Sequence, residues 1–458
     1  MLPQPKIAPQ QSANLGLRLA VNQRAGIILF LMGHVPLGIL AHSSSFISTL
    51  HGLVTFGVGL YWAATNAPFH KIAYICAYIT GIEVFWRMTG ATSLGVFYEA
   101  GKYYVIFITG LALFRIRVRT IPALPFFYIL LLVPAILVTL GMTSAAEARD
   151  QISSNFSGPF AIFICAVFFS QVHLSRQQMR TALLALVAGV VSVAAVSTYS
   201  TITAANITWT TESNFTTSGG FGPNQVSSAL GLGAFAAWFL ISHLERDRLL
   251  RIILTVLGVW FLGQALLTFS RGGVYNALIP IAALTLLKSI RERRQLNTLV
   301  LPVLAILVFV LVLLPQLDTL TEGMLGARYN KGDVTGRDQI IQLDIQIFLD
   351  NPLGVGVGMA QDYRVAYADY YVAAHTEYSR LLAEHGILGL FALGLLIFMT
   401  ATNVFKNWHQ SLAHSAKLGL CLWALIQFIH AATRIVAPSF CIGLTFATLV
   451  DDNELLIT

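Results

Sequence analysis

Charged side chains are scarce in this sequence. Asp, Glu, Lys and Arg make up 11% of the 458 residues, against roughly 25% in an ordinary soluble domain. Hydrophobic residues make up 56%, and the mean hydropathy is +0.71. Too little charge is present to cover a soluble surface, which excludes a conventional cytosolic enzyme. Apolar runs of about 17–25 residues recur instead, the length of a helix that spans a bilayer. They predict an all-α polytopic membrane protein, because the alternation of a membrane β-barrel is missing.

The sequence also lacks the usual marks of metal, disulfide and nucleic-acid chemistry. Its four cysteines lie inside apolar runs, without metal-ligand spacing, and are expected to be buried. The aspartates beyond residue 316 lack the spacing of a calcium loop. We therefore expect metal-independent chemistry without a cofactor. The net charge of +7 does not indicate nucleic acid, because basic residues of membrane proteins collect in cytoplasmic loops.

The apolar runs predict about fourteen membrane helices, at about 25–41, 46–64, 71–87, 97–114, 122–141, 158–173, 180–203, 222–244, 249–268, 272–288, 298–315, 376–401, 417–434 and 436–450. The segments 158–173 and 436–450 are short enough to be re-entrant, so twelve spans are an alternative. Eighteen of the 28 Lys and Arg residues then lie in cytoplasmic segments if the N-terminus is inside. The expected units are a cytoplasmic N-terminal segment without a cleaved signal peptide, a first helical bundle, one long outer loop, the last helices and a cytoplasmic tail: 1–24, 25–315, 316–374, 375–450 and 451–458.

Ten basic residues fall on the outer side, where the positive-inside bias acts against them. Three have acidic neighbours at helical spacing and can be ion-paired: Arg87 with Glu83, Lys102 with Glu99, and Arg380 with Glu377 or Glu384. Arg271 and Arg337 have no such neighbour. So many outer cations indicate an anionic partner on that side.

Two short motifs place arginines where an anionic headgroup would lie. Ser270-Arg271-Gly272-Gly273 forms a tight connection between two apolar runs, which puts Arg271 at the outer interface beside flexible glycines. Gly336-Arg337 opens a predicted helix, and a helix N-terminus attracts anions. A guanidinium matches phosphate oxygens with two parallel hydrogen bonds. The alternatives are a snorkelling arginine at Arg271 and a solvated loop arginine at Arg337.

The predicted helix 337–350 reads as amphipathic. It has one apolar stripe, Ile341, Ile345, Phe348 and Leu349, and one polar stripe, Gln339, Gln342, Gln346 and Asp350. Asn351-Pro352 stops this helix. The glycine-rich segment 353–358 follows, and we expect it to bend closely against another part of the chain, because it lacks the features of a nucleotide-binding loop.

His375 stands where the chain returns to the membrane after the long loop. Histidine is the natural general base near neutral pH, and the alternative is an interfacial histidine without a role. Tyr378 and Glu384 lie within three turns and can orient it. His430 and Arg434 form a weaker candidate pair. Asn224, at the outer start of a helix, either caps that helix or marks backbone that faces an anion.

Together these motifs resemble the O-antigen ligase and O-antigen polymerase superfamily of membrane glycosyltransferases. The resemblance covers about 222–400 and rests on the order of three pieces: Ser270-Arg271-Gly272-Gly273; Gly336-Arg337 with Asn351-Pro352-Leu353-Gly354-Val355-Gly356; and His375-Thr376-Glu377-Tyr378 leading to Glu384-His385-Gly386-Ile387-Leu388-Gly389. One departure is the stretch Asp338–Ile341, where family members often carry an aromatic residue.

The resemblance implies a helical bundle of the lipid-sugar-dependent glycosyltransferase type in the bacterial inner membrane, with its active site facing the periplasm. It implies an undecaprenyl-diphosphate-linked glycan as donor and, for a ligase, lipid A–core as acceptor. Because no carboxylate is clearly placed as a covalent nucleophile, we expect a single displacement that inverts the anomeric carbon. Carried over by motif, Arg271 and Arg337 hold the diphosphate, and His375 assists the acceptor hydroxyl. Supporting roles are expected for five further residues: Tyr378, Glu384, Arg380, Arg87 and Asn224.

Three alternatives stay open. The motif order favours a ligase, but a polymerase that joins repeat units, or a protein-glycosylating relative, would share the donor site. A solute transporter belongs to a different class. It should show an inverted repeat and polar residues at mid-membrane, whereas here the polar residues cluster at one face.

Overall fold

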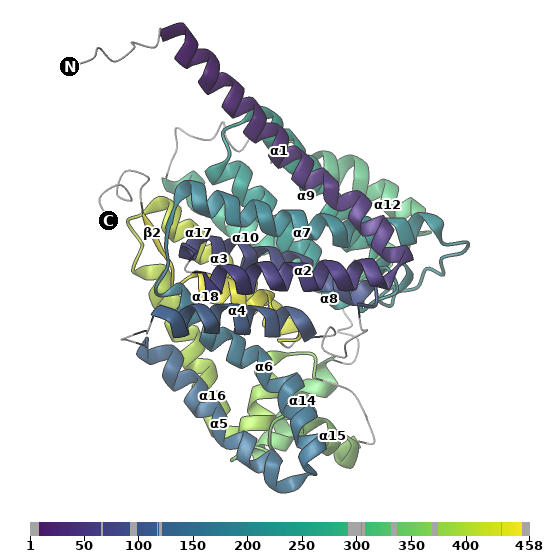
Figure 1. Ribbon diagram of the computed structural model, residues 1–458. Helices are drawn as coiled ribbons and strands as arrows, with labels where there is room; N and C mark the ends of the chain where they lie inside the picture. Colours follow the sequence, from purple (N-terminus) through teal and green to yellow (C-terminus); the bar gives the residue numbers. More distant parts are fainter. Residues whose placement is uncertain are drawn as a thin grey trace, which may run out of the picture.

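The computed structural model describes residues 9–450, except 66, 92–98, 117, 119–120, 292–303, 305–306, 331–336, 369–373 and 432. Most of these residues form helices that pack side by side in one bundle, which α1 crosses on its outside (Figure 1). The helices of the first half are α1 (Pro9–Ser43), α2 (Ser45–Ala64), α3 (Phe69–Met88), α4 (Ala100–Ile116), α5 (Ala123–Met142), α6 (Ala145–Phe169), α7 (Arg176–Thr203) and α8 (Pro223–Phe239), which continues into a π-helix, Leu240–Leu244.

The second half contains α9 (Arg248–Leu267), α10 (Arg271–Arg291), α12 (Leu314–Leu320), α13 (Met324–Asn330), α14 (Arg337–Asp350), α15 (Ala360–Ala368), α16 (Glu377–Phe405), α17 (Ser411–His430) and α18 (Ala437–Leu444). The strands β1 (His173–Ser175) and β2 (Thr448–Val450) pair in parallel. The long segment after α10 is therefore built largely from short helices. Of these, α14 matches the helix predicted after Gly336.

Ten of the described helices are long and apolar enough to cross a membrane. The predicted class, an all-α polytopic membrane protein, is confirmed. Of the other four predicted spans, α3 and α4 occupy 71–87 and 97–114, with α4 only 17 residues long. In the predicted span 298–315, residues 298–303 and 305–306 lie outside the described residues, and the rest includes a π-helix, Phe309–Leu313, and the start of α12.

Two predicted spans differ from expectation. Residues 158–169 are the second part of α6, a 25-residue helix capped by Ser144, and the whole helix is long and apolar enough to cross a membrane. The segment 436–450 is a helix only over the eight residues of α18. It then extends into β2, whose backbone is satisfied by β1, with Thr448 donating to the carbonyl of Val172 at 2.9 Å. Counting apolar residues cannot reveal this, since a buried strand with a partner satisfies its backbone as well as a helix does.

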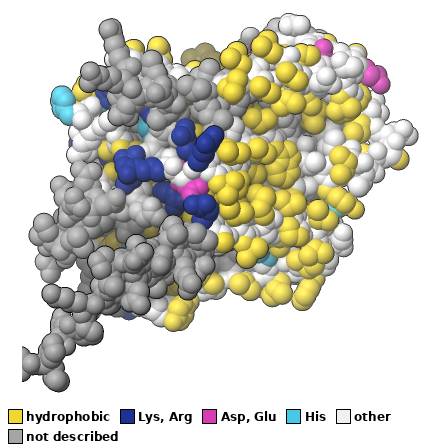
Figure 2. All heavy atoms as spheres, turned by 90° about the horizontal axis from the view of Figure 1, so that it is seen from above, with side chains coloured by type: hydrophobic (Ala, Val, Ile, Leu, Met, Phe, Trp, Pro, Cys, Tyr) yellow, Lys and Arg dark blue, Asp and Glu magenta, His cyan; other side chains and the backbone are white. Residues whose placement is uncertain are grey.

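Hydrophobic side chains cover much of the face seen from above, and Lys and Arg gather on one side of it (Figure 2). Exposed apolar residues such as Leu29 of α1 and Val256 of α9 are where a bilayer would contact the protein. At one end of the bundle the ion pairs Arg24–Asp247 and Arg180–Glu245 lie at 2.8 and 2.6 Å. The predicted outer segments meet at the opposite end, and the candidate site lies there.

The four cysteines are buried and free, as expected from their apolar surroundings.

Candidate functional site

Arg271 is the first residue of α10, and a tightly held turn presents it. Phe269 in this turn has a positive φ of 58°, a conformation that is costly for a bulky residue and needs support. Arg328 of α13 donates to the Phe269 carbonyl at 3.1 Å. Ser270 donates from Oγ to Oδ1 of Asn224 at 2.8 Å. The turn is thus fixed from α8 and α13, and Asn224 acts on Arg271 through Ser270.

Gly272 and Gly273 do not provide the flexibility that the sequence suggested. Both lie inside α10. A Cβ on Gly272 would overlap the ring of His430, and one on Gly273 would overlap the backbone of Ser227. The glycines allow α10 to press against α17 and α8, and this close packing determines where Arg271 stands.

Arg337 opens α14, as predicted, and lies among other arginines. Burial lowers the pKa of Arg337, and the charges of Arg328 and Arg271 lower it further. Repulsion of this kind acts only between cations that are close together in poorly hydrated surroundings. Arg271, Arg328 and Arg337 therefore form one region of concentrated positive charge.

His375 joins this region immediately before α16. It is partly buried. Burial lowers the pKa of His375 to about 4, and the charges of Arg337, Arg434 and Arg364 act in the same direction. At neutral pH the ring is therefore uncharged, and one of its nitrogens can accept a proton. The structure thus brings together the three residues predicted as the core of the site, Arg271, Arg337 and His375.

Arg434, which the sequence marked only as half of a weaker pair, lies close enough to act on His375. Its side chain is exposed. Its backbone is held by α3, because Arg87 donates to the Arg434 carbonyl at 2.8 Å and pairs with Glu83. Glu83 in turn accepts from the backbone N–H of Val436 at 2.6 Å.

A second ion-pair network holds the same segment from α16. Arg380 pairs with Glu377 at 2.6 Å and with Glu384 at 2.7 Å. Glu377 also accepts from the backbone N–H of Thr433 at 3.0 Å. The three charged side chains are buried. Residues 433–436 are therefore clamped between two charged networks, which fixes the position of Arg434.

Behind His375, a buried polar chain ties three elements of the long segment together. Arg364 of α15 pairs with Asp344 of α14 at 2.7 Å. Ser379 donates to the other carboxylate oxygen of Asp344 at 2.6 Å. Ser379 also bonds Thr376, the N-cap of α16, at 2.7 Å. This chain fixes Arg337 and His375, on separate elements, relative to each other.

The glycine-rich segment after α14 interlocks with a kink in α16. The amide of Gly356 donates to the Glu384 carbonyl at 3.0 Å, and that of Ile387 donates to the Pro352 carbonyl at 2.9 Å. Gly386 breaks the helical conformation of α16 with a φ of 60°. A Cβ on Gly354 would overlap the backbone of residues 384–386. The close bend that we expected from 353–358 is confirmed, and its partner is the Glu384-His385-Gly386 motif.

The five predicted supporting residues do not reach His375 by any hydrogen bond that the structure describes. Tyr378 instead donates to the Leu425 carbonyl of α17 at 2.9 Å. Arg380 pairs with Glu384, and Arg87 pairs with Glu83. These are ion pairs that the helical spacing in the sequence allowed. Asn224 lies at the start of α8 and holds Ser270.

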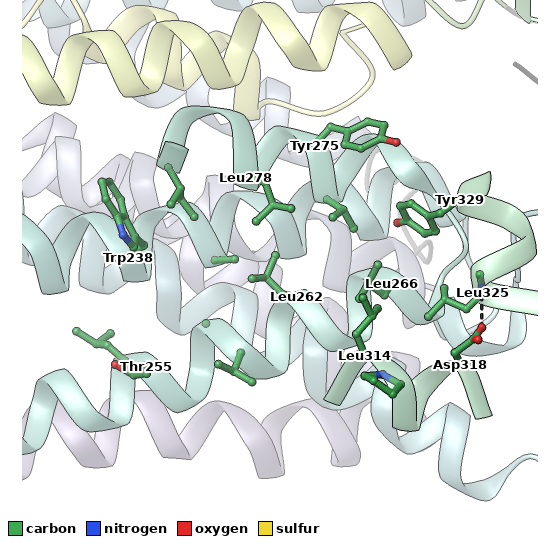
Figure 3. Close-up of a pocket in the computed structure, with 18 of the residues that line it drawn as sticks. Trp238, Thr255, Leu262, Leu266, Tyr275, Leu278, Leu314, Asp318, Leu325 and Tyr329 are labelled. Carbon is green, nitrogen blue, oxygen red and sulfur yellow. Dashed lines mark hydrogen bonds between the residues drawn. The ribbon is translucent and has the colours of Figure 1, made fainter. Parts of the chain in front are cut away.

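A cavity of about 670 Å³ lies between α8, α9, α10, α12 and α13. Its lining is mostly apolar, with Trp238 toward one end and Tyr275 and Tyr329 toward the other (Figure 3). That second end adjoins the arginines. Tyr275 follows Arg271 by one turn. Burial raises the pKa of Tyr329, and the charges of Arg271 and Arg328 act to lower it. The cavity thus offers an apolar channel that ends at concentrated positive charge.

This arrangement suits a molecule with an apolar chain and an anionic head. The apolar part can lie between helices, and the anion can lie among the arginines beside an uncharged histidine. Among the described residues, no group of three or more His, Cys, Asp or Glu is placed to hold a metal ion. The fold and the site define a polytopic membrane protein with a cationic polar site at one end of its bundle.

Residues 256–394 match the model of the O-antigen ligase family. The match starts within α9, ends within α16 and includes Arg271, Arg337 and His375. The match makes this part of the chain similar to O-antigen ligases and supports a glycosyl-transferring activity of that type. No curated protein matches the chain.

Three arginines near the site were missed as site residues: Arg328, Arg364 and Arg434. The sequence does contain a sign of their role, because all three belong to the ten basic residues that the predicted topology places on the outer side. Arg434 lies outside the matched region. Only the folded chain reveals that residues so far apart in sequence surround one histidine.

Proposed function

We propose that the protein transfers a glycan from undecaprenyl diphosphate to a sugar hydroxyl of lipid A–core, at the periplasmic face of the bacterial inner membrane. The observation that carries this proposal is the apolar cavity lined at one end by Tyr329, on which the charges of Arg271 and Arg328 act. A polyprenyl diphosphate has the same two parts, an apolar chain and a dianionic head. Part of the polyprenyl chain occupies the cavity, and the diphosphate lies at its arginine end.

Arg271 and Arg337 bind the diphosphate, with Arg434 as a further cation at the rim. Each charge-assisted hydrogen bond contributes about 1.5–3 kcal/mol. Because Arg328 and Arg271 repel Arg337, a bound dianion lowers the electrostatic energy of the site. As the glycosidic bond breaks, negative charge grows on the leaving diphosphate, so the same arginines also lower the barrier.

His375 accepts the proton of the acceptor hydroxyl. In the free protein the low pKa makes His375 a weak base. A bound diphosphate offsets the charge of Arg337 and Arg434, which raises the pKa of His375 toward its ordinary value. Donor binding thus strengthens the general base where it is needed.

The reaction is a single displacement. The acceptor oxygen attacks the anomeric carbon from the face opposite the diphosphate, and its proton passes to His375. The bond between the anomeric carbon and the diphosphate oxygen breaks, and the diphosphate leaves with the electron pair. The configuration at the anomeric carbon is inverted.

The test is transfer by purified protein in liposomes, with an undecaprenyl-diphosphate glycan as donor and each acceptor offered separately. Transfer to lipid A–core is expected. Transfer only to a second molecule of donor would make the protein a polymerase, since both activities would use the same donor site. Absence of transfer to any acceptor, together with flux of a solute, would overturn the proposal.

Arginines supply the positive charge in this mechanism, so transfer is expected to persist after exhaustive treatment with EDTA. The rate before and after chelation measures this. A loss that magnesium or manganese restores would contradict the proposed role of the arginines.

A further inference from the structure

Only part of the predicted apolar stripe of α14 packs against the protein, because Ile341 and Phe348 are partly buried while Ile345 and Leu349 are exposed. The residues of this helix that the structure buries are Ile340, Asp344 and Ile347. Ile345 and Leu349, from the predicted apolar stripe, are 42% and 69% exposed. Leu353, one turn further along the chain, is 77% exposed. The helix therefore has one packed face, which includes Asp344, and one exposed apolar face.

The uncovered face is continuous with the lipid-facing surface of α16. Pro352 accepts a hydrogen bond from the backbone of Ile387 at 2.9 Å. Ile387 is the first residue after the kink of α16 and begins an exposed apolar run that continues through Leu390 and Phe391. Leu353, the residue after Pro352, therefore lies near the part of α16 where exposed apolar side chains begin. The 19 residues from Ile387 to Phe405 rise about 29 Å as a helix, close to the thickness of the hydrocarbon core.

A third side of α14, separate from the packed side and from the exposed apolar side, is polar and exposed. Gln342, Gln346 and Asp350 carry it. A helix with one face packed on the protein, one apolar face open and one polar face open fits the boundary between headgroups and acyl chains. Water on both open faces would leave large apolar side chains exposed beside a membrane surface that can cover them.

We propose that α14 lies in the membrane interface, with Ile345, Leu349 and Leu353 among the acyl chains of the leaflet on the His375 side. Because Arg337 is the first residue of this helix, the contact with lipid sets the depth of Arg337 at the headgroup level. The effect on Arg337 rests on the proposed function, in which Arg337 binds the donor diphosphate. The proposed contact of α14 with lipid does not depend on the proposed function.

The direct test uses full-length protein in liposomes with a single spin label on α14. Leu349→Cys and Ile345→Cys report the apolar face, and Gln346→Cys, which is about 100° around the helix from Ile345, is the matched control for Ile345. The four native cysteines are buried, and an unsubstituted sample measures their residual labelling. Oxygen concentrates among acyl chains, whereas a polar nickel complex stays in water. We expect labels at Leu349 and Ile345 to collide more often with oxygen, and the label at Gln346 to collide more often with the nickel complex.

Two results would overturn the proposal. Labels at Ile345 and Gln346 with the same access to the nickel complex would mean that the apolar face is in water. A label at Leu349 shielded from both reagents would mean that protein covers it. Spin–spin broadening would then identify a second copy of the chain as that cover.

A functional arm tests the link to Arg337. Leu349→Glu should raise KM for the lipid donor about tenfold while kcat changes little, because displacing α14 weakens donor binding. Gln346→Glu adds the same charge on the polar face and should leave KM unchanged. Equal KM values for the two variants would overturn the effect on Arg337. Absence of transfer by unsubstituted protein would contradict the proposed function instead, and the label results would be unaffected by it.

Discussion

Two groups of basic side chains lie at the same end of the bundle and behave differently. Arg87, Arg364 and Arg380 are buried and pair with carboxylates at or near hydrogen-bond distance. Arg271 and Arg337 start helices, and burial together with the charges of Arg328 and Arg271 lowers the pKa of Arg337. The first group stabilises the backbone around the site, and the second concentrates positive charge in it.

The difference teaches how to interpret an arginine in a membrane protein. A buried cation costs free energy unless it is paired, so an arginine near a carboxylate is accounted for by the fold. Arginines that crowd together raise the energy of the protein, and an anionic ligand offsets this cost. The predictions below test whether the two groups separate in this way.

The largest expected effect is at His375, which lies close enough to Arg337 for the charge of Arg337 to lower its pKa. His375→Ala should lower turnover about 10²–10⁴-fold, the usual contribution of a general base, while binding of the lipid donor stays nearly the same. Turnover and donor affinity are measured on one preparation. His409→Ala, an exposed histidine beyond α16, is the matched control and should be fully active. A folded and active His375→Ala protein would leave catalysis to the arginines alone.

Arg271→Ala and Arg337→Ala should each weaken donor binding by about 1.5–3 kcal/mol, roughly 10- to 150-fold. Lysine keeps the charge but loses the two parallel hydrogen bonds, so Arg→Lys should recover only part of the affinity. Titration with undecaprenyl diphosphate measures the effect. Full recovery by lysine would show that the contact is simple charge attraction.

The pH dependence should differ between the free and the donor-bound protein. His375 accepts a proton only when neutral, so kcat/KM, which reports the free protein, should fall as pH drops through about 4. The dianion bound next to Arg337 raises the pKa of His375, so kcat should begin to fall at a higher pH. The same inflection in kcat and kcat/KM would argue against neutralisation of the arginines by the donor. His375→Ala, assayed for its residual rate, separates this inflection from ionisation of the diphosphate.

Arg434→Gln should have a smaller effect. Its side chain is exposed, and exposed charged contacts contribute about 0.2–1 kcal/mol, so donor affinity should fall about fivefold or less. Arg149→Gln, an exposed arginine paired with Asp150, is the control. A loss as large as that of Arg337→Ala would place Arg434 in direct contact with the diphosphate.

Local patterns predicted those parts of the molecule that depend on neighbours in sequence. Residues a few positions apart in sequence predict three of these features. They are the helix 337–350, the possible ion pairs of Arg87 and of Arg380 with nearby glutamates, and the close bend at 353–358. The strand β2 and the open apolar face of α14 were not predicted, since both depend on which distant element lies alongside. Arg434 joins the site because α3 and α16 clamp residues 433–436, and no local pattern in the sequence shows that contact.

The central claim, that paired arginines stabilise the fold and crowded arginines bind the donor, is tested most directly with Arg380→Ala and Arg337→Ala as a matched pair. For each variant, the Tm and the affinity for undecaprenyl diphosphate are measured on the same purified protein. Arg380→Ala leaves Glu377 and Glu384 buried without their partner, which should cost about 3–5 kcal/mol and lower the Tm. Arg337→Ala removes a charge that its neighbours repel, so its Tm should stay the same or rise while donor affinity falls. A lower Tm in Arg337→Ala with normal affinity in the folded protein would contradict the account.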